Sequence, residues 1–359
     1  MMKLWARQIV SVVRLEMKKT FFSKRGLWVY LLAFAPVALY MIHSVYATRQ
    51  YQHLAQLATE HPISRAAFNG IQTGLSRDQV VEKLGDPYWQ RTLYHDRESE
   101  KERSFVLYKY TDGKNDITYH FRDGKLTHIE RRDPDTLPKS QLIFATSFQF
   151  YFLRLAIFFG CVGIFVNLFR GEMLDKSLHF YMLTPMRREV LLAGKYFAGL
   201  LATTVIFTSS TALQWWAMLW QFERGVIVDF LASPGWSQFA AYLSVTALAC
   251  VGYGSIFLAV GLLFRNPIIP TVAVLLWESA NPFLPPLLKK TSMIYYLQSL
   301  CPVTAPPDKN MPPVINLLIS PTGPASTLTA VTCIVLLTLL VLVLASRLAR
   351  KLEINYSSD

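Results

Sequence analysis

Charged side chains are scarce in this chain of 359 residues. Asp, Glu, Lys and Arg make up only 17% of it, whereas apolar residues make up 52% and come in long blocks. Charged residues are about 25% of a typical soluble domain, so the composition excludes an ordinary soluble protein. A helix needs about 20 apolar residues to cross a bilayer. We therefore interpret the chain as a polytopic membrane protein.

Motifs for catalysis and metal binding are also lacking. The sequence has no H-E-x-x-H and no G-x-S-x-G, which excludes the commonest zinc protease and serine hydrolase signatures. The four cysteines have no metal-ligand spacing, and none lies in the polar part of the chain, so no disulfide framework is expected. His120 and His128 are expected on neighbouring strands, but no third ligand such as His95 has a compelling position. We expect no metal site.

A phosphate-binding loop is missing as well. The pattern G-x-x-x-x-G-K-[ST] is approached only at Gly194-Lys195. Glu189 stands where the first Gly is required and would repel phosphate, and Tyr196 replaces the hydroxyl residue that holds magnesium. The chain is not expected to be an enzyme or to bind ATP and magnesium itself.

Positive charge exceeds negative charge, with 36 Lys and Arg against 24 Asp and Glu and a net charge of +12. The basic residues gather at the ends of the apolar blocks. This distribution is the one that sets membrane topology, so we expect the lipid bilayer, and no nucleic acid, as the partner of these charges.

Residues 1–25 are expected to form a cytoplasmic amphipathic helix on the bilayer surface, with the helix itself over residues 3–22. Its basic and polar face carries Lys3, Arg7, Ser11, Arg14 and Lys18, and its apolar face carries Trp5, Ile9, Val12 and Val13. The first span follows at 26–47. A cleaved signal peptide is the alternative, but the apolar run is too long for one and a basic helix precedes it.

Residues 48–140 differ from the rest because they are polar and charged. Ser76 is expected to cap a helix that ends at Gly85. Strand-like runs follow at 105–110, 117–121 and 126–130, with a tight turn before the last. The sequence predicts a small α+β domain outside the cytoplasm, which folds independently.

Residues 141–351 are expected to hold spans two to six, an outer segment at 286–324 and, after them, a cytoplasmic tail at 352–359. The expected spans begin between 142 and 148 and end at 169, then cover 191–220, 236–264, a fifth from 267, and 325–345. The fold class predicted is a polytopic all-α membrane protein with six transmembrane helices and one inserted α+β domain. Lys and Arg are dense at the inner junctions, so both termini are expected inside, in the cytoplasmic (inner) membrane.

The inner loop at 170–190 joins the second and third spans. As a helix it has an apolar face of Leu174, Leu178, Tyr181 and Met182 and a polar face of Glu172, Asp175, Lys176 and His179. Pro185 predicts a turn before Arg187 and Arg188. Periodicity alone leaves two interpretations open: a helix on the membrane or a partner, or a solvated loop that only sets topology.

Two charges fall inside predicted spans, Arg154 in the second and Glu278 in the fifth. A lone charge near the middle of a bilayer costs about 3 kcal/mol on insertion scales. We expect the two to pair directly or to line a polar cavity. The alternative is that Arg154 reaches the outer headgroups and Glu278 is protonated or faces a dimer interface.

Taken together, the basic N-terminal helix, the first span with its outer domain, and the run F-R-G-E-M-L-D-K-S-L-H-F-Y-M-L-T-P-M-R-R resemble an ABC exporter permease of the type-two class, ABC-2. The resemblance covers the membrane portion, and 169–195 is its most specific part. It implies a coupling helix in the inner loop that docks on a separate ATPase subunit, and two permease halves, identical or different. The residues it assigns to ATPase coupling are Glu172, Leu174, Asp175, Lys176, Leu178, His179, Tyr181, Met182, Arg187 and Arg188.

The outer insert is a departure from many members of that class. Its run G-L-S-R-D-Q-V-V-E-K-L-G-D-P resembles the signature of BamE-like (SmpA/OmlA) domains, in which a helix precedes a small sheet. This resemblance implies a protein-contact module rather than an active site, and leaves room for a protein partner outside the cytoplasm. The alternative function is a membrane-anchored scaffold whose outer domain binds envelope proteins without transport.

Overall fold

The structure is a computed structural model, in which the chain divides into two compact units. A membrane unit comprises Met1–Met41 and Ser140–Asp359, and an outer unit comprises Ile42–Lys139. The residues that the structure describes are 2–22, 26–60, 63, 67–68, 70–96, 103–113, 115–132, 135–174, 187–264, 266–305 and 322–350.

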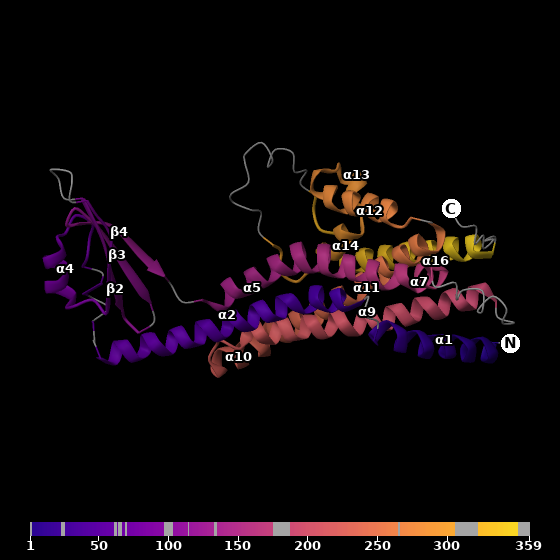
Figure 1. Ribbon diagram of the computed structural model, residues 1–359, viewed down its shortest axis with the longest axis horizontal. Helices are drawn as coiled ribbons and strands as arrows, with labels where there is room; N and C mark the ends of the chain where they lie inside the picture. Colours follow the sequence, from indigo (N-terminus) through magenta and orange to yellow (C-terminus); the bar gives the residue numbers. More distant parts are fainter. Residues whose placement is uncertain are drawn as a thin grey trace. The chain divides into compact units, whose positions relative to one another are not determined.

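Helices make up the membrane unit (Figure 1). In chain order they are α1 (Met2–Phe22), α2 (Leu27–Glu60, continuing into the outer unit), α5 (Leu137–Ser147), η2 (Phe148–Ile157), α6 (Phe158–Cys161), η3 (Val162–Val166), α7 (Asn167–Leu174), α9 (Arg188–Leu219), α10 (Arg224–Phe230), η4 (Leu231–Gly235), α11 (Trp236–Leu263), α12 (Ile268–Ala280), η5 (Asn281–Phe283), α13 (Pro286–Lys289), α14 (Met293–Ser299) and α16 (Thr327–Arg350).

Within the described ranges, five helices are long and apolar enough to cross a membrane: Leu27–Glu60, Leu137–Gly171, Arg188–Leu219, Arg224–Leu263 and Thr327–Arg350. They correspond to the first, second, third, fourth and sixth spans expected from the sequence, so the chain is a polytopic helical membrane protein. The expected fifth span is different. α12 has only 13 residues, about 20 Å of helix, because the prolines that follow it end the helix.

The second span is one continuous helical run that contains two π-helical stretches, η2 and η3. It begins at Leu137, five or more residues before the expected start, because Leu137–Ser147 is helical although its sequence is less apolar. Its aromatic side chains are central to the core: Phe144 packs edge-on against Trp215 and Tyr242, with ring centroids 5.3 and 4.9 Å away.

Hydroxyl groups join the spans where no water is expected. Thr211 of α9 and Thr246 of α11 form a hydrogen bond of 3.0 Å, and Ser210 of α9 donates to the carbonyl of Ala33 in α2. These hydroxyl side chains are all buried, namely those of Thr211, Thr246 and Ser210. Hydrogen bonds between helices satisfy polar groups that would be costly to leave unpaired in the bilayer.

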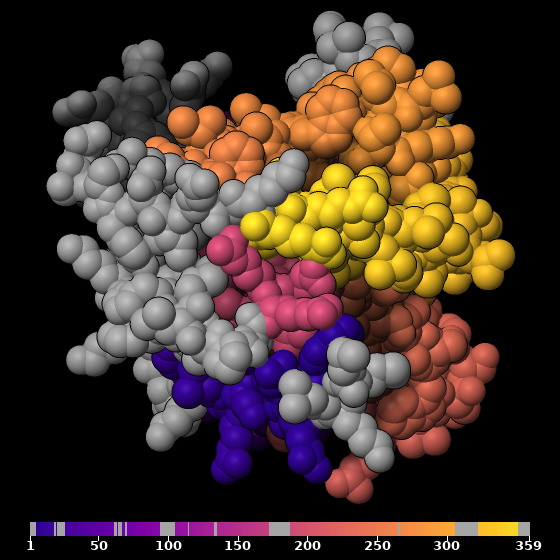
Figure 2. Space-filling model, turned by 90° about the vertical axis from the view of Figure 1, so that its right-hand side faces the viewer, coloured from indigo at the N-terminus to yellow at the C-terminus, as the bar shows by residue number. Residues whose placement is uncertain are grey.

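The expected N-terminal amphipathic helix is confirmed as α1. Its Arg7 and Arg14 are exposed and its Val12 is buried, as the pattern predicts. The apolar face is not free for lipid, however, because α1 packs along α9 (Figure 1). Figure 2 shows the end of the membrane unit where α1, in indigo, lies close to α7, in magenta.

The outer unit contains the helix α4 (Arg77–Leu84), which begins and ends as expected. Ser76 caps it in a reciprocal capping box with Gln79, and Gly85 follows it with a φ of 76°. Its Val80 and Leu84 are buried against the sheet. A positive φ favours glycine, which accounts for Gly85 at the end of this helix.

The sheet of the outer unit has four antiparallel strands in the order β1-β2-β3-β4. They are β1 (Trp89–Asp96), β2 (Arg103–Thr111), β3 (Asp116–Arg122) and β4 (Lys125–Arg132). Three of them match the expected runs, whereas β1 was not expected. Its sequence WQRTLYHD is polar because it is an edge strand, which needs few apolar residues. The insert was expected from residue 48; the outer unit begins at Ile42, within α2, which continues to Glu60.

Candidate functional site

The predicted coupling residues fall partly outside the described residues. Glu172 and Leu174 lie in the last turn of α7. Arg187 is the residue immediately before α9, in extended conformation, and Arg188 begins the helix. The remaining predicted residues, which are Asp175, Lys176, Leu178, His179, Tyr181 and Met182, lie outside the described part of the chain. The structure therefore describes what holds the two ends of the inner loop.

Both ends of the loop are held in one cluster of contacts, which we name the inner-loop junction. It consists of α1, the start of α7, the first two turns of α9 and the last turn of α16. At its centre Lys195 of α9 donates from Nζ to Oε1 of Glu16 in α1, at 2.7 Å, and to the carbonyl of Leu168 in α7, at 2.8 Å. The ammonium also lies 5.3 Å from the ring centroid of Phe169.

This ion pair is buried. The side chain of Lys195 is 0% exposed and that of Glu16 is 4% exposed. An isolated charge in such a place costs several kcal/mol of desolvation, and only a close partner with further hydrogen bonds offsets that cost. The pair is therefore a specific link between three helices, and α7 is the helix that leads directly into the inner loop.

The Lys195–Glu16 ion pair can form because α1 and α9 approach each other closely. Gly194 precedes Lys195, and a Cβ added to Gly194 would lie 2.8 Å from the Cβ of Val12 in α1. Any side chain there would push α1 away from α9. Small residues at helix contacts allow backbones in membranes to approach closely, so Gly194 keeps Glu16 within reach of Lys195.

The far end of the loop is held by two arginines. The guanidinium of Arg187 lies over the ring of Trp5 in α1, 5.0 Å from its centroid. Arg188 donates from Nη1 to the carbonyls of Ala349 and Arg350, each at 3.1 Å. These carbonyls are at the end of α16, where the helix dipole favours a cation. Arg187 and Arg188 thus contact α1 and α16.

Sequence reasoning missed Glu16 and Lys195. A signal was present in each case. Glu16 is the only acidic residue of α1 and lies on its buried side, and Lys195 stands alone in an apolar stretch. Each is an unexplained charge in an apolar environment, which by itself indicates a partner. Periodicity does not say which charge meets which, because the two lie 179 residues apart.

Glu278 is the other buried carboxylate of interest, and its side chain fastens α12 to α14. It accepts hydrogen bonds from the backbone N–H of Met293, at 3.0 Å, and of Ile294, at 2.8 Å. The hydroxyls of Ser292 and Tyr253 also donate to it, at 3.1 and 3.3 Å. Glu278 is therefore a side-chain cap for the first turn of α14, where backbone N–H groups have no partner within the helix.

Arg154 does not form an ion pair with Glu278. Its guanidinium lies 5.4 Å from the ring centroid of Phe150, and its Nε is buried without a hydrogen-bond partner. The direct pair considered from the sequence is therefore not formed in this structure. Glu278 instead accepts from four donors of α11 and the first turn of α14. The sequence pattern could not predict them, because only short helical turns connect α12 to α14.

The outer unit carries titratable groups in a packed environment. Burial, reinforced by a hydrogen bond to Asp116, raises the pKa of Tyr88. Burial raises the pKa of Tyr119 to about 12. Nε2 of His120 lies 3.2 Å from Oε2 of Glu130, and the ring centroids of His120 and His128 are 5.4 Å apart. Across the described residues, no group of three or more His, Cys, Asp or Glu is arranged to hold a metal ion.

Neither a family model, nor a curated protein, nor a solved structure matches this chain. The resemblances to type-two ABC exporter permeases and to BamE-like domains therefore depend on the residues themselves.

Proposed function

We propose that this chain is the membrane-spanning permease subunit of an ATP-driven ABC exporter in the cytoplasmic membrane, and that a separate ATPase subunit docks on the segment from Glu172 to Leu183. The observation that supports the proposal best is the inner-loop junction. A force applied to the loop reaches α7 directly, α1 and α9 through the Lys195–Glu16 pair, and α16 through Arg188. A loop that only set topology would not need a buried ion pair beside it.

The same contacts support six crossings, with both ends of the chain in the cytoplasm. Arg187 lies over Trp5 of the first helix, and Arg188 bonds the last turn of α16. Ends on one side of a membrane require an even number of crossings, and five helices have spanning length in the part of the chain that the structure describes. We propose that α12 and the short helices after it complete the remaining crossing, with Glu278 holding α12 to α14.

The outer unit is proposed to be a BamE-like contact module on the opposite side of the membrane. Its helix is capped as that signature requires, and its sheet is a simple meander. Such a module would bind an envelope protein or its own permease partner, and it adds no chemistry of its own. The permease is proposed to act as a pair, with a second copy or with a related chain.

The test places a charge on the apolar face of the proposed coupling helix. Leu178→Asp and Tyr181→Asp are compared with the wild type after affinity purification from native membranes. The quantity measured is the ATP hydrolysis that co-purifies with the tagged chain. A desolvated charge in a docking groove costs more than the ~1.4 kcal/mol that corresponds to tenfold weaker binding, so each variant should retain less than about one tenth of that activity.

A matched control carries the same new charge far from the loop in sequence. Thr92 is exposed on β1 of the outer unit, and Thr92→Asp should leave co-purifying ATP hydrolysis unchanged. Equal activity in all three variants would contradict the docking site. A wild-type chain that performs its envelope function with no nucleotide present would favour the scaffold interpretation instead.

A further inference from the structure

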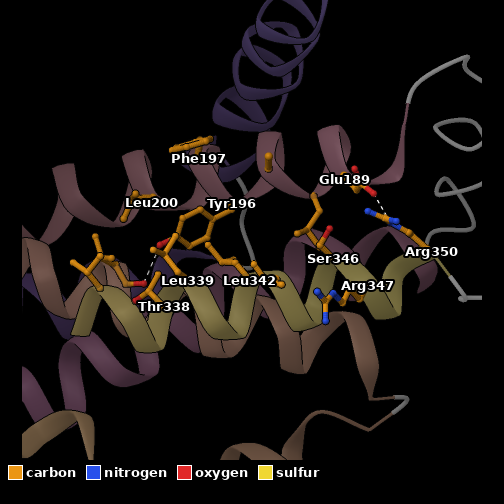
Figure 3. A pocket seen from close by; sticks show the side chains of 15 residues that line it. Glu189, Tyr196, Phe197, Leu200, Thr338, Leu339, Leu342, Ser346, Arg347 and Arg350 are labelled. Atoms are coloured by element: carbon orange, nitrogen blue, oxygen red, sulfur yellow. Dashed lines mark hydrogen bonds and ion pairs between the residues drawn. The ribbon is translucent and has the colours of Figure 1, made fainter. Parts of the chain in front are cut away.

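A groove runs along the membrane unit between α9 and α16, apart from the Lys195–Glu16 pair and from Glu278 (Figure 3). Its volume is about 660 Å³. Apolar side chains line most of it, namely Leu192, Tyr196, Phe197, Leu200, Leu339 and Leu342. On the α9 side it extends from Glu189 to Leu200, which is about 17 Å of helix.

One end of the groove is charged. Glu189 and Arg350 form an ion pair there and Ser346 lies near it, whereas Arg347 lines the same end with its side chain directed away from the pair (Figure 3). Arg188 also lies at this end and bonds the carbonyls of the last turn of α16. Arg347 is exposed. Among the described residues that line this mouth, Arg347 and Arg350 stand against one glutamate, Glu189, so their net charge is positive, whereas most of the remaining lining is apolar.

We propose that the groove binds one acyl chain of an anionic phospholipid, whose phosphate lies against Arg347 at the mouth. Two features support this occupant. The groove is about as long as one leaflet of the hydrocarbon core is deep, roughly 15 Å, and its cationic end is where a headgroup would be. A helix from a second copy crosses both leaflets, so it would need a groove longer than this one.

Charge makes the site selective. Lipid tails surround every membrane protein, so an apolar groove alone gains little over the general annulus. The lipid phosphate at the mouth raises the affinity of this groove above that of the annulus, because each Arg near an anionic headgroup favours binding by about fivefold. The proposal concerns lipid retention and does not depend on the exporter function.

The test uses the purified full chain, delipidated in detergent and supplied with phosphatidylglycerol or phosphatidylcholine. Native mass spectrometry then counts the lipids that remain bound. One phosphatidylglycerol per chain should be retained. Leu342→Trp fills the groove and should abolish that retention. Leu340→Trp places the same bulk on the same helix at an exposed position outside the groove, and should leave it intact.

Arg347→Gln tests the headgroup. This variant should bind phosphatidylglycerol about fivefold more weakly, and its preference over phosphatidylcholine should fall by the same factor, while its melting temperature without lipid stays that of the wild type. Equal retention in the two Trp variants would overturn the proposal. So would self-association that Leu342→Trp abolishes while lipid retention is unchanged, since the groove would then hold a second copy.

Discussion

Breaking the buried Lys195–Glu16 pair should destabilise the membrane unit strongly. Lys195→Met removes the ammonium that Glu16 contacts at 2.7 Å, and Glu16→Leu removes the carboxylate that Lys195 contacts. Either change leaves a charge in a place where both side chains are less than 5% exposed. Removing one partner of a buried ion pair costs about 3–5 kcal/mol, so each single variant should lose that much of its free energy of unfolding.

The double variant should behave differently. When apolar side chains of similar size replace both partners, neither charge of the pair has to be desolvated, and such replacements are often neutral or stabilising. The double variant should therefore be close to wild type in stability. The coupling energy obtained from the four proteins should then be close to the sum of the two single losses, about 6–10 kcal/mol, which exceeds the ~3 kcal/mol upper end for ordinary contacting residues.

The assay is reversible unfolding of the full chain in mixed micelles, followed by its tryptophan fluorescence. Arg14→Met is the matched control, because Arg14 is exposed on the same helix and its loss should change stability by less than about 0.5 kcal/mol. Losses in the two single variants that simply add in the double variant would refute the reasoning. So would single losses no larger than that of the control.

Three further results are expected. Glu278→Ala leaves the N–H groups of Met293 and Ile294 without a buried acceptor. It should lower the free energy of unfolding by at least about 2 kcal/mol and speed hydrogen exchange in α12 and α14. Unchanged exchange rates would show that the cap does not matter. Ser76→Ala removes the capping box of α4 and should lower the stability of the outer unit by about 1 kcal/mol, measured by chemical denaturation. Folding raises the pKa of Tyr119 from 10.0 to about 12. The stability that the neutral Tyr119 side chain contributes to the folded state is therefore complete below pH 10 and is lost as pH rises toward 12. The melting temperature of Tyr119→Phe should depend less on pH over this range than that of the wild type.

The sequence was sufficient where one local pattern decides the structure. Apolar blocks located the long helices within the described ranges, and Ser76 and Gly85 located the two ends of α4. It was insufficient where long-range contacts decide. α12 looked like a span because its residues are apolar, yet its length is limited by Pro282. β1 was missed because an edge strand carries little apolar pattern.

The candidate site was predictable in outline only. The inner loop was located from its charges and its place between two spans. Its anchoring was not, because Glu16 meets Lys195 across 179 residues. Arg154 and Glu278 were singled out as costly charges, but the partners of Glu278 are backbone N–H groups of α14. Backbone donors have no sequence signature, so no reading of side chains would have found them.

The most direct test of the central claim is a photo-crosslink from the inner loop. A photoreactive residue replaces Leu178 in the full chain, and the same residue at Thr92 of the outer unit is the control. After irradiation in native membranes, Leu178 should trap a protein that carries its own phosphate-binding loop and hydrolyses ATP, whereas Thr92 should not. If Leu178 traps only lipid or solvent, or the same proteins as Thr92, the claim that this loop docks an ATPase is contradicted.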